Sequence, residues 1–455
     1  MAISKLNKKV LGKWFIYGLL YCVTTAIVVS VFILPENDAD YLPTLRTVII
    51  VCASILLVKY FIYMVLSPWS DVAAVVREMR YAHKDFNPRV SVIIPEWNES
   101  VGIVSTLQSL AESTHRNLEV VVVDDGSTDD SGKKVQDFIK AYRKDYGAFD
   151  TPIDFVYHYK ENGGKGRALN RGIQISTGDI ILSIDADCVL DPDAVANFVK
   201  CFRDPHVMAA VGNVKIGSTK SLIGTVQYLE FLFSFYFKKA DSLVNAIYII
   251  GGAAGAFRRE VFQRIGLYNP RNITEDIEMS VRIQAAGMRI VYASDAIIYT
   301  EGASDLRGLI KQRQRWKRGR FQTFADHRYL FFSGRKEHNK VLTWLILPLA
   351  MFGEMQLFLE PLFLLFLYVY SWYVNDFSSF ISGVVVVSSM FFVQVWFDDR
   401  KSHSTLFYFL APIGWLLFYQ TTFVEFMALA KAGYGFVRGK EMSWQRWQRK
   451  GLDNV

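Results

Sequence analysis

Long apolar runs at both ends of the chain limit what it can fold into. Two runs, Trp14–Leu34 and Leu45–Leu66, lie near the N-terminus, and three more, Leu342–Val374, Phe380–Phe397 and Leu406–Ala430, lie near the C-terminus. Runs of this length are what a transmembrane helix requires. The stretch between the two groups has the composition of an ordinary globular domain. The sequence therefore predicts an integral membrane protein with a folded domain inserted between N- and C-terminal transmembrane helices.

The distribution of charge indicates how the first runs are oriented. Lys5, Lys8, Lys9 and Lys13 precede the first run, so the start of the chain is expected to stay on the cytoplasmic side. The loop 35–44 carries three acidic residues and no basic residue, and it should face outward. No convincing cleavage site follows the first run, which is therefore interpreted as a retained anchor. This orientation puts the central domain in the cytoplasm and the protein in the cell's inner (plasma) membrane.

The C-terminal part gives no consistent count of crossings. Five apolar runs would leave the tail outside, whereas the basic residues of 431–455 favour a tail inside. One explanation is that Leu342–Val374, which contains Glu354, Glu360 and two prolines, is not a simple span. The predicted organisation is two transmembrane helices in 1–66, a cytoplasmic domain in 87–304, interfacial helices in 305–340, a transmembrane region in 341–430 and a basic cytoplasmic tail in 431–455.

Composition argues against two other classes of protein. The formal net charge of +7 would suit nucleic-acid binding, but the basic residues cluster beside the apolar runs and no nucleic-acid motif is present. We therefore expect membrane lipid, and no nucleic acid, among the partners. The cysteines, Cys22, Cys52, Cys188 and Cys201, show neither a disulfide framework nor paired zinc spacing. They are predicted to be buried free thiols in a reducing compartment.

The central domain shows the pattern of an α/β fold. Three short β-rich runs, Val90–Ile94, Leu118–Val123 and Ile180–Ile184, alternate with polar segments long enough for helices. This alternation is typical of βαβ units and a mainly parallel sheet. Because ligands of such sheets bind at the carboxyl ends of the strands, the residues that follow each run are the candidates for chemistry.

Paired acids follow the second predicted strand. Four valines run into Asp124 and Asp125, which puts carboxylates at the carboxyl end of the strand, where a nucleotide could meet them. The alternative is a cap on the next helix, which would explain one of the two acids more easily than both.

A second acidic pair follows the third predicted strand. Asp185 and Asp187 stand at i and i+2, so their side chains point the same way in extended backbone. Two like charges held together are costly, and a divalent cation relieves that cost. Carboxylate oxygens suit Mg²⁺ or Mn²⁺, and a nucleotide diphosphate would supply further oxygen ligands. A solvated loop with helix-capping acids is the alternative.

A glycine-rich turn and an acidic tripeptide add weaker candidates. Lys165 lies in a glycine turn that lacks the spacing of a phosphate loop, so a position near phosphate and a plain loop are equally compatible with it. In Thr274-Glu275-Asp276, a carboxylate far in sequence from the other acids could act as a general base towards an acceptor hydroxyl. The same tripeptide could equally cap a helix.

The last candidate segment is Gln312-Arg313-Gln314-Arg315-Trp316. Arg315 could neutralise charge that develops on a leaving diphosphate, and Trp316 offers a flat face for a sugar ring. For the basic residues that flank them, contact with lipid head groups is a strong alternative. These are Lys311, Lys317, Arg318 and Arg320.

Taken in order, these segments resemble the D, DxD, TED and QxxRW motifs of the processive family-2 glycosyltransferases, which include cellulose, chitin, hyaluronan and poly-N-acetylglucosamine synthases. The resemblance covers roughly residues 88–322, and the flanking spans fit it. Each motif is weak alone, but four in order between membrane spans are highly specific.

The resemblance implies a GT-A-like fold and an inverting, metal-dependent transfer from a nucleotide sugar that makes β linkages. Asp125 would contact the nucleobase, Asp185 the donor ribose or phosphate region, and Asp187 the metal. Asp276 would be the general base, beside Glu275. The remaining implied contacts are Asp124 and Lys165 for the donor and Gln312, Arg315 and Trp316 for the diphosphate and acceptor end.

The sequences of two segments look most like those of bacterial poly-β-1,6-N-acetylglucosamine synthases. These segments are Ala256-Phe257-Arg258-Arg259 and Thr274-Glu275-Asp276-Ile277-Glu278. One departure is Glu96, an acid where family members often have a small residue or cysteine. A second departure is that the tail after Ala430 shows no cyclic-dinucleotide-binding domain, so such control would require another, accessory membrane subunit.

Three functions are compatible with these features. The first is polymerisation of a UDP-sugar, with UDP-N-acetylglucosamine as the best candidate, onto a growing glycan that is exported through the spans. The second is addition of a single sugar to a lipid. The third is a non-catalytic channel or scaffold subunit, which the complete set of acidic motifs disfavours.

Overall fold

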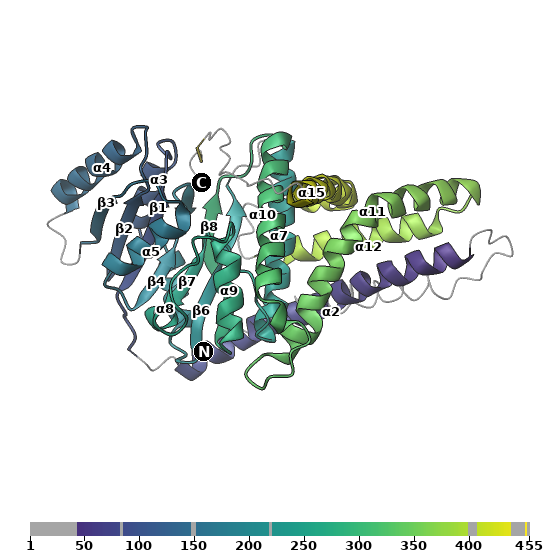
Figure 1. Cartoon of the computed structure of the whole chain (residues 1–455), viewed down its shortest axis with the longest axis horizontal. Coiled ribbons are helices and arrows are strands. Elements are labelled where there is room, and N and C mark those ends of the chain that lie inside the picture. The colour runs from purple at the N-terminus through teal and green to yellow at the C-terminus, as the bar shows by residue number, and fades with distance from the viewer. Residues whose placement is uncertain are drawn as a thin grey trace.

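The computed structural model describes residues 43–81, 85–146, 152–217, 221–398, 407–437 and 451–452. The predicted first span, Trp14–Leu34, lies outside the described residues, and so does most of the basic tail. The sheet domain and a group of long helices lie at opposite ends of the molecule, with α7, α9 and α10 between them (Figure 1).

An eight-stranded mixed sheet forms the core of the domain. Its order is β3-β2-β1-β4-β7-β6-β8-β5. The pairs of β1 with β2 and β4, of β2 with β3 and of β6 with β8 are parallel, whereas β7 and β5 pair with their neighbours in antiparallel fashion. The strands are β1 Val90–Glu96, β2 Leu118–Asp124, β3 Asp154–Tyr159, β4 Ile180–Ser183, β5 Cys188–Leu190, β6 Val207–Ile216, β7 Gly255–Arg258 and β8 Arg289–Thr300.

The three strands predicted from the sequence are neighbours in this sheet, in the order β2-β1-β4. Every residue of β2 is buried, because helices cover both faces of a parallel sheet and each side chain then meets apolar neighbours. The helix α5 packs on β1 and β2, while α6 packs on β8 and β6. The helices of this domain are α3 Ile103–Ala111, α4 Ser131–Tyr146, α5 Lys165–Ile175, α6 Ala194–Cys201, α8 Arg259–Ile265 and α9 Glu275–Ala285.

The remaining helices leave the sheet domain. They are α2 Pro43–Tyr81, α7 Leu222–Leu243, α10 Leu306–Asp326, α11 Leu347–Tyr373, α12 Ser378–Trp396, α14 Phe407–Leu410 and α15 Gly414–Val437. Here α2 packs along α7, and α10 packs along α15. The predicted run Leu45–Leu66 lies inside α2, and the segment predicted to be interfacial is mainly α10.

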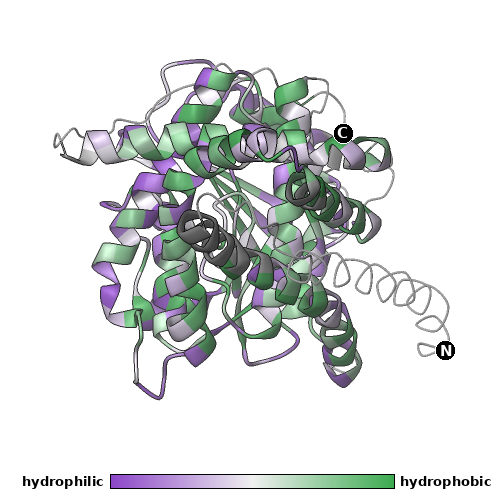
Figure 2. Cartoon of the chain, turned by 90° about the vertical axis from the view of Figure 1, so that its right-hand side faces the viewer, coloured by the Kyte–Doolittle hydropathy of each residue, from purple (hydrophilic) through white to green (hydrophobic). Residues whose placement is uncertain are grey.

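One helix among the described residues, Leu342–Tyr373, is long and apolar enough to cross a membrane, and Val384–Trp396 is a shorter apolar helix. The long helix starts with a π-helical turn and continues through Glu354, Glu360 and Pro361 without a break. Large apolar side chains of α11, such as Leu362 and Trp372, are exposed, and the helices that project towards the viewer in Figure 2 are largely hydrophobic. The number of crossings stays a prediction.

A buried ion pair joins the sheet domain to the end of α12. Lys215 on β6 pairs with Asp398, and the two side chains are 4% and 2% exposed. The hydroxyl of Tyr228 on α7 donates to the second Asp398 oxygen at 3.4 Å. The carboxylate of Asp398 therefore holds together three elements that are far apart in sequence.

Asp398→Asn is expected to destabilise the fold strongly, because it leaves the Lys215 ammonium group buried without a counter-charge. Removing one partner of a buried pair typically costs about 3–5 kcal/mol. The thermal unfolding midpoint of the purified protein measures the loss. The control is Glu260→Gln, which breaks the exposed pair with Arg264 and should change stability by less than about 1 kcal/mol. Equal midpoints for the two variants would contradict the structural role of Asp398.

Candidate active site

A cavity of about 720 Å³ lies at the carboxyl ends of β1, β2 and β4 and extends between the long helices. Nine of the ten site residues predicted from the sequence line it. They are Asp125, Lys165, Asp185, Asp187, Glu275, Asp276, Gln312, Arg315 and Trp316. Residues separated by almost two hundred positions thus share one cleft, as convergence on a single ligand requires.

Asp125 organises the glycine-rich turn that precedes α5. Its buried carboxylate accepts the backbone N–H groups of Gly163 at 3.0 Å and Gly164 at 2.6 Å and pairs with Lys160. Gly164 has a φ of 92°, a conformation that favours glycine. The end of β2 and the turn that carries Lys165 are therefore fixed to each other.

Asp124 does not line the cavity. Its carboxylate accepts the backbone N–H of Ser127 at 2.7 Å and the hydroxyl of Tyr157 at 2.6 Å. Burial and the neighbouring Asp124 raise the pKa of Tyr157. These contacts are those of a residue that holds the turn after β2, and its assignment to the donor stays a prediction.

Lys165 contacts two acids of the cavity. Its ammonium nitrogen lies 2.5 Å from Asp185 and 3.4 Å from Glu275. Burial alone would lower the pKa of Lys165, but the carboxylates of Asp185, Glu275 and Asp276 together outweigh burial and raise it. The structure places this side chain in the acidic cleft, and its contact with a donor phosphate stays a prediction.

The acidic pair after β4 has the chemistry of a partial metal site. Asp187 is 7% exposed and the Asp185 side chain is 33% exposed. Within the described ranges, no three His, Cys, Asp or Glu side chains come together as a complete metal site. Mg²⁺ is commonly held by one or two carboxylates together with substrate phosphates rather than by a protein cage. The carboxylates of the pair have the chemistry for a cation shared with a bound diphosphate, and their assignment as metal ligands stays a prediction.

The two candidate catalytic acids open α9. Asp276 accepts the backbone N–H of Gly252 at 2.8 Å with one oxygen and that of Ile277 at 2.8 Å with the other. A Cβ atom at Gly252 would stand 2.7 Å from the Lys165 ammonium nitrogen, so glycine permits the close approach. Burial, reinforced by Asp276 and opposed by Lys165, raises the pKa of Glu275. The first turn of α9 therefore presents two carboxylates that lie in different surroundings.

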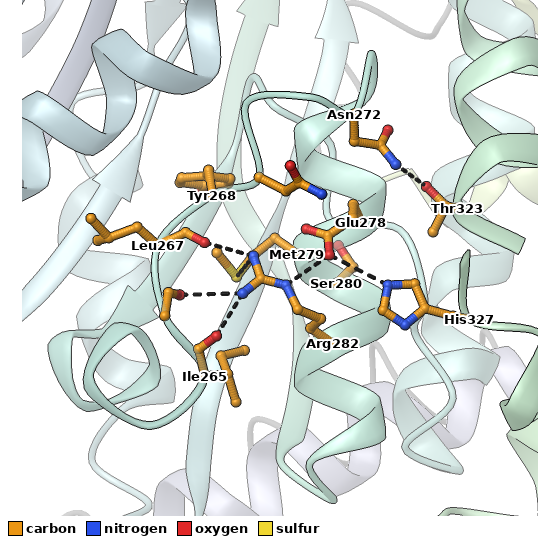
Figure 3. A network of polar contacts seen from close by, with 12 residues as sticks. Ile265, Leu267, Tyr268, Asn272, Glu278, Met279, Ser280, Arg282, Thr323 and His327 are labelled. Carbon is orange, nitrogen blue, oxygen red and sulfur yellow. Dashed lines mark hydrogen bonds and ion pairs between the residues drawn. The ribbon is translucent and has the colours of Figure 1, made fainter. Parts of the chain in front are cut away.

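Contacts of Glu278 and Arg282, further along α9, fix the position of this helix (Figure 3). The guanidinium group of Arg282 donates to the carbonyls of Ile265 at 2.6 Å and Leu267 at 2.7 Å. It also pairs with Glu278 at 2.8 Å, and Glu278 lies 3.3 Å from the ring of His327 at the end of α10. The helix with the acids is therefore attached to the helix with the tryptophan motif.

Close packing brings α10 to the cavity. Asp305 caps its start by accepting the N–H of Gly308 at 2.6 Å. A Cβ atom at Gly319 would collide with the Thr274 side chain at 2.2 Å, so glycine lets α10 approach the residue before α9. Gln312 Oε1 is buried and has no hydrogen-bond partner in the described part of the chain. It is an acceptor that a ligand could use.

Glu96 is a cavity residue whose role the sequence left open. It is 1% exposed, at the end of β1, and accepts the hydroxyl of Ser127 at 3.0 Å. Burial, with a smaller effect of Asp124, raises the pKa of Glu96 from 4.5 to about 7. The only sequence signal was an acid where family members often have a small residue or cysteine, and β1 continues through Pro95 to end at Glu96. Lys160 carried no signal, because its role depends on a tertiary contact with Asp125.

Glu96→Gln is expected to make the protein relatively more stable as the pH rises. The folded state holds the Glu96 proton more tightly than the unfolded state. The stability that comes from neutral Glu96 is therefore complete below pH 4.5 and is lost as the pH passes about 7. Glutamine stays neutral, so the variant should gain up to about 3 kcal/mol over the wild type by pH 8.5.

Thermal unfolding midpoints at pH 5.5 and 8.5 measure about 2 kcal/mol of this gain, because the rest has already developed at pH 5.5. Glu112→Gln, at an exposed position, serves as the control and should show no such pH dependence. A constant difference between Glu96→Gln and the wild type across this range would mean that Glu96 does not titrate there.

Comparisons with known proteins find relatives of this chain. A family model described as "Glycosyltransferase like family 2" matches residues 88–319. A poly-beta-1,6-N-acetyl-D-glucosamine synthase of Staphylococcus epidermidis is 26% identical over 378 residues, which is 80% of this chain and 88% of the relative. The enzyme of the same name from Staphylococcus aureus strain COL is 28% identical over 295 residues, 61% of this chain and 69% of the relative.

A solved structure shares the fold. The mannosyltransferase PcManGT of Pyrobaculum calidifontis, in complex with GDP-Man and Mn²⁺, has a TM-score of 0.52 and 22% identity, covering 84% of this chain and 99% of that one. The expected GT-A-like fold, with a mixed and mostly parallel sheet, is confirmed. So is the resemblance to family-2 enzymes and to poly-β-1,6-N-acetylglucosamine synthases. Because the family match covers the sheet, α9 and most of α10, the chain belongs to the family-2-like glycosyltransferases.

Proposed function

We propose that the chain is a membrane-bound inverting β-glycosyltransferase that polymerises a UDP-sugar into an extracellular polysaccharide and couples growth to export. UDP-N-acetylglucosamine is the best candidate for the donor, in agreement with the names of the staphylococcal relatives. The observation that carries the proposal is that distant segments of the chain line one and the same cavity. It contains the four motifs and continues past Tyr63 on α2, Gly353 and Glu360 on α11, and Thr421 on α15.

In this reaction, Asp276 accepts the proton of an acceptor hydroxyl as its oxygen attacks the anomeric carbon of the donor. The new bond forms on the face opposite the diphosphate, whose bond to that carbon breaks with the electron pair. Inversion makes a β linkage from an α-linked donor. The two N–H donors at 2.8 Å support the role, because they orient the carboxylate before an acceptor arrives.

Asp187, assisted by Asp185, would hold Mg²⁺ or Mn²⁺ in the presence of the donor, and the ion would neutralise charge on the diphosphate. The Mn²⁺ in the mannosyltransferase complex supports this assignment. Lys165 and Arg315 would supply further positive charge to the diphosphate, and Asp125 would meet the nucleobase. Gln312 and Trp316 would contact the acceptor end of the glycan.

The apolar α11 supports a place in the inner (plasma) membrane, with the sheet domain in the cytoplasm. In that arrangement the exposed side chains of α11 contact lipid, and the donor enters from the cytoplasm. A small accessory membrane subunit is a further partner that we propose for export or control.

Incubation of membranes that contain the protein with radiolabelled UDP- and GDP-sugars tests the function. A polymer ladder from UDP-N-acetylglucosamine that a β-1,6-specific hydrolase degrades is the expected product. A single radiolabelled glycolipid would instead support the alternative, transfer of one sugar to a lipid acceptor. Radiolabelled product only from GDP-mannose would overturn the donor assignment.

A further inference from the structure

Six charged side chains gather on the wall of the cavity where α10 meets the long helices. The cations are Arg313, Lys317 and Arg320 of α10, and the anions are Glu230 of α7, Glu354 of α11 and Glu425 of α15. At i, i+4 and i+7, the cations share one face of α10. The cluster has three basic and three acidic side chains.

Glu425 is the member of this cluster that connects two successive turns of α10. Its carboxylate lies 2.7 Å from the Lys317 ammonium nitrogen and 3.4 Å from Nε of Arg313. Glu354 holds Lys317 from the other side at 2.7 Å and also pairs with Arg320. Lys317 would therefore keep a partner without Glu425, so α10 would remain attached to α11.

Arg313 links this ion cluster to the tryptophan of the active site. Its guanidinium carbon lies 4.2 Å from the centroid of the Trp316 ring, which is the distance of a cation–π contact. Arg313 also pairs with Glu230 at 2.7 Å. Two carboxylates on different helices therefore determine where the guanidinium group lies over the indole.

We propose that Glu425 is a positioning residue, which holds Arg313 against Trp316 and so fixes the indole plane on which the acceptor end of the glycan rests. The inference rests on the proposed function, because it assigns an acceptor to Trp316. It gives α15, a helix outside the sheet domain, a direct influence on the acceptor site.

The numbers of basic and acidic side chains in the cluster indicate what the loss of Glu425 would do. Three cations would then face two carboxylates, and Arg313 would keep only Glu230 as a partner. The guanidinium group should shift towards α7 and leave the indole less restricted. The contacts of Asp125, Lys165 and Asp276 do not involve this cluster, so donor binding should be unchanged.

The test compares Glu425→Gln, Glu425→Asp and Arg313→Lys in the full chain, with a short glycan acceptor and UDP-N-acetylglucosamine. For Glu425→Gln we expect KM for the acceptor to rise about 3- to 30-fold, the range that loss of a cation–π contact supplies. The product should be shorter, and KM for the donor should stay within twofold. Glu425→Asp should restore much of the acceptor affinity.

Arg313→Lys separates positioning from general stability. Lysine can keep an ion pair but lacks the planar group that stacks on the indole. It should therefore show the same acceptor defect with an unchanged unfolding midpoint, and it carries the test if Glu425→Gln does not fold. Glu260→Gln, at an exposed pair far from the cavity, is the matched control.

The outcomes distinguish the two proposals. If the wild-type protein transfers no sugar to the acceptor, the proposed function is wrong, and the inference is wrong with it. If the wild type polymerises and the variants lower kcat without a change in acceptor KM or product length, the positioning role alone is overturned.

Discussion

Asp276→Asn is expected to lower kcat by about 10²- to 10⁴-fold, the usual contribution of a general base. Asparagine has the same shape, and its side-chain oxygen can still accept the N–H of Gly252, so the first turn of α9 should keep its structure. It cannot accept a proton from the acceptor hydroxyl. Glu275 should not replace it, because Glu275 is engaged with Lys165.

Initial rates with radiolabelled donor measure the loss, and displacement of UDP by the donor measures binding. Donor affinity should change by less than about threefold, since the lost interaction acts in the transition state. Asp137→Asn, at an exposed position of α4, is the matched control and should retain full activity. A variant at position 276 with more than about a tenth of wild-type kcat would rule out Asp276 as the base.

Strands β1, β2 and β4, and the acids that follow them, could be predicted from local pattern. The run Val120–Val123 is apolar throughout because both faces of β2 are covered, and the chain turns at the acids where the sheet ends. The other five strands, among them the antiparallel β5 and β7, were not predicted. β7 has four residues and β5 has three, and their partners are determined by long-range pairing that no short window contains.

The charged residues of α10 show more clearly that local sequence does not reveal long-range partners. Contact with lipid head groups was a strong alternative for Lys317 and Arg320 from the sequence. In the structure, both pair with Glu354 on α11, and Lys317 is 6% exposed. That partner stands tens of residues away and becomes relevant only once α10 and α11 are packed together. The lipid interpretation of these two residues is therefore wrong, and its cause is the missing tertiary neighbour.

Asp187→Asn is expected to abolish the effect of divalent cations on donor binding, while Asp185 keeps its pair with Lys165. A carboxylate replaced by an amide of the same size loses the charge that a hard cation requires. Because a bound cation contributes several kcal/mol by neutralising phosphate charge, UDP affinity in Mn²⁺ should fall roughly 100-fold or more.

Calorimetric titration of UDP, with Mn²⁺ and with chelator, tests Asp187 independently of catalysis. In chelator the wild type and Asp187→Asn should bind UDP equally weakly, because the direct contacts of Asp125 and Lys165 do not depend on position 187. Asp137→Asn should behave as the wild type in both conditions. If Mn²⁺ strengthens UDP binding to Asp187→Asn as much as to the wild type, the cation is held elsewhere. Of the two acids after β4, Asp185 would then still orient Lys165, with which it pairs at 2.5 Å.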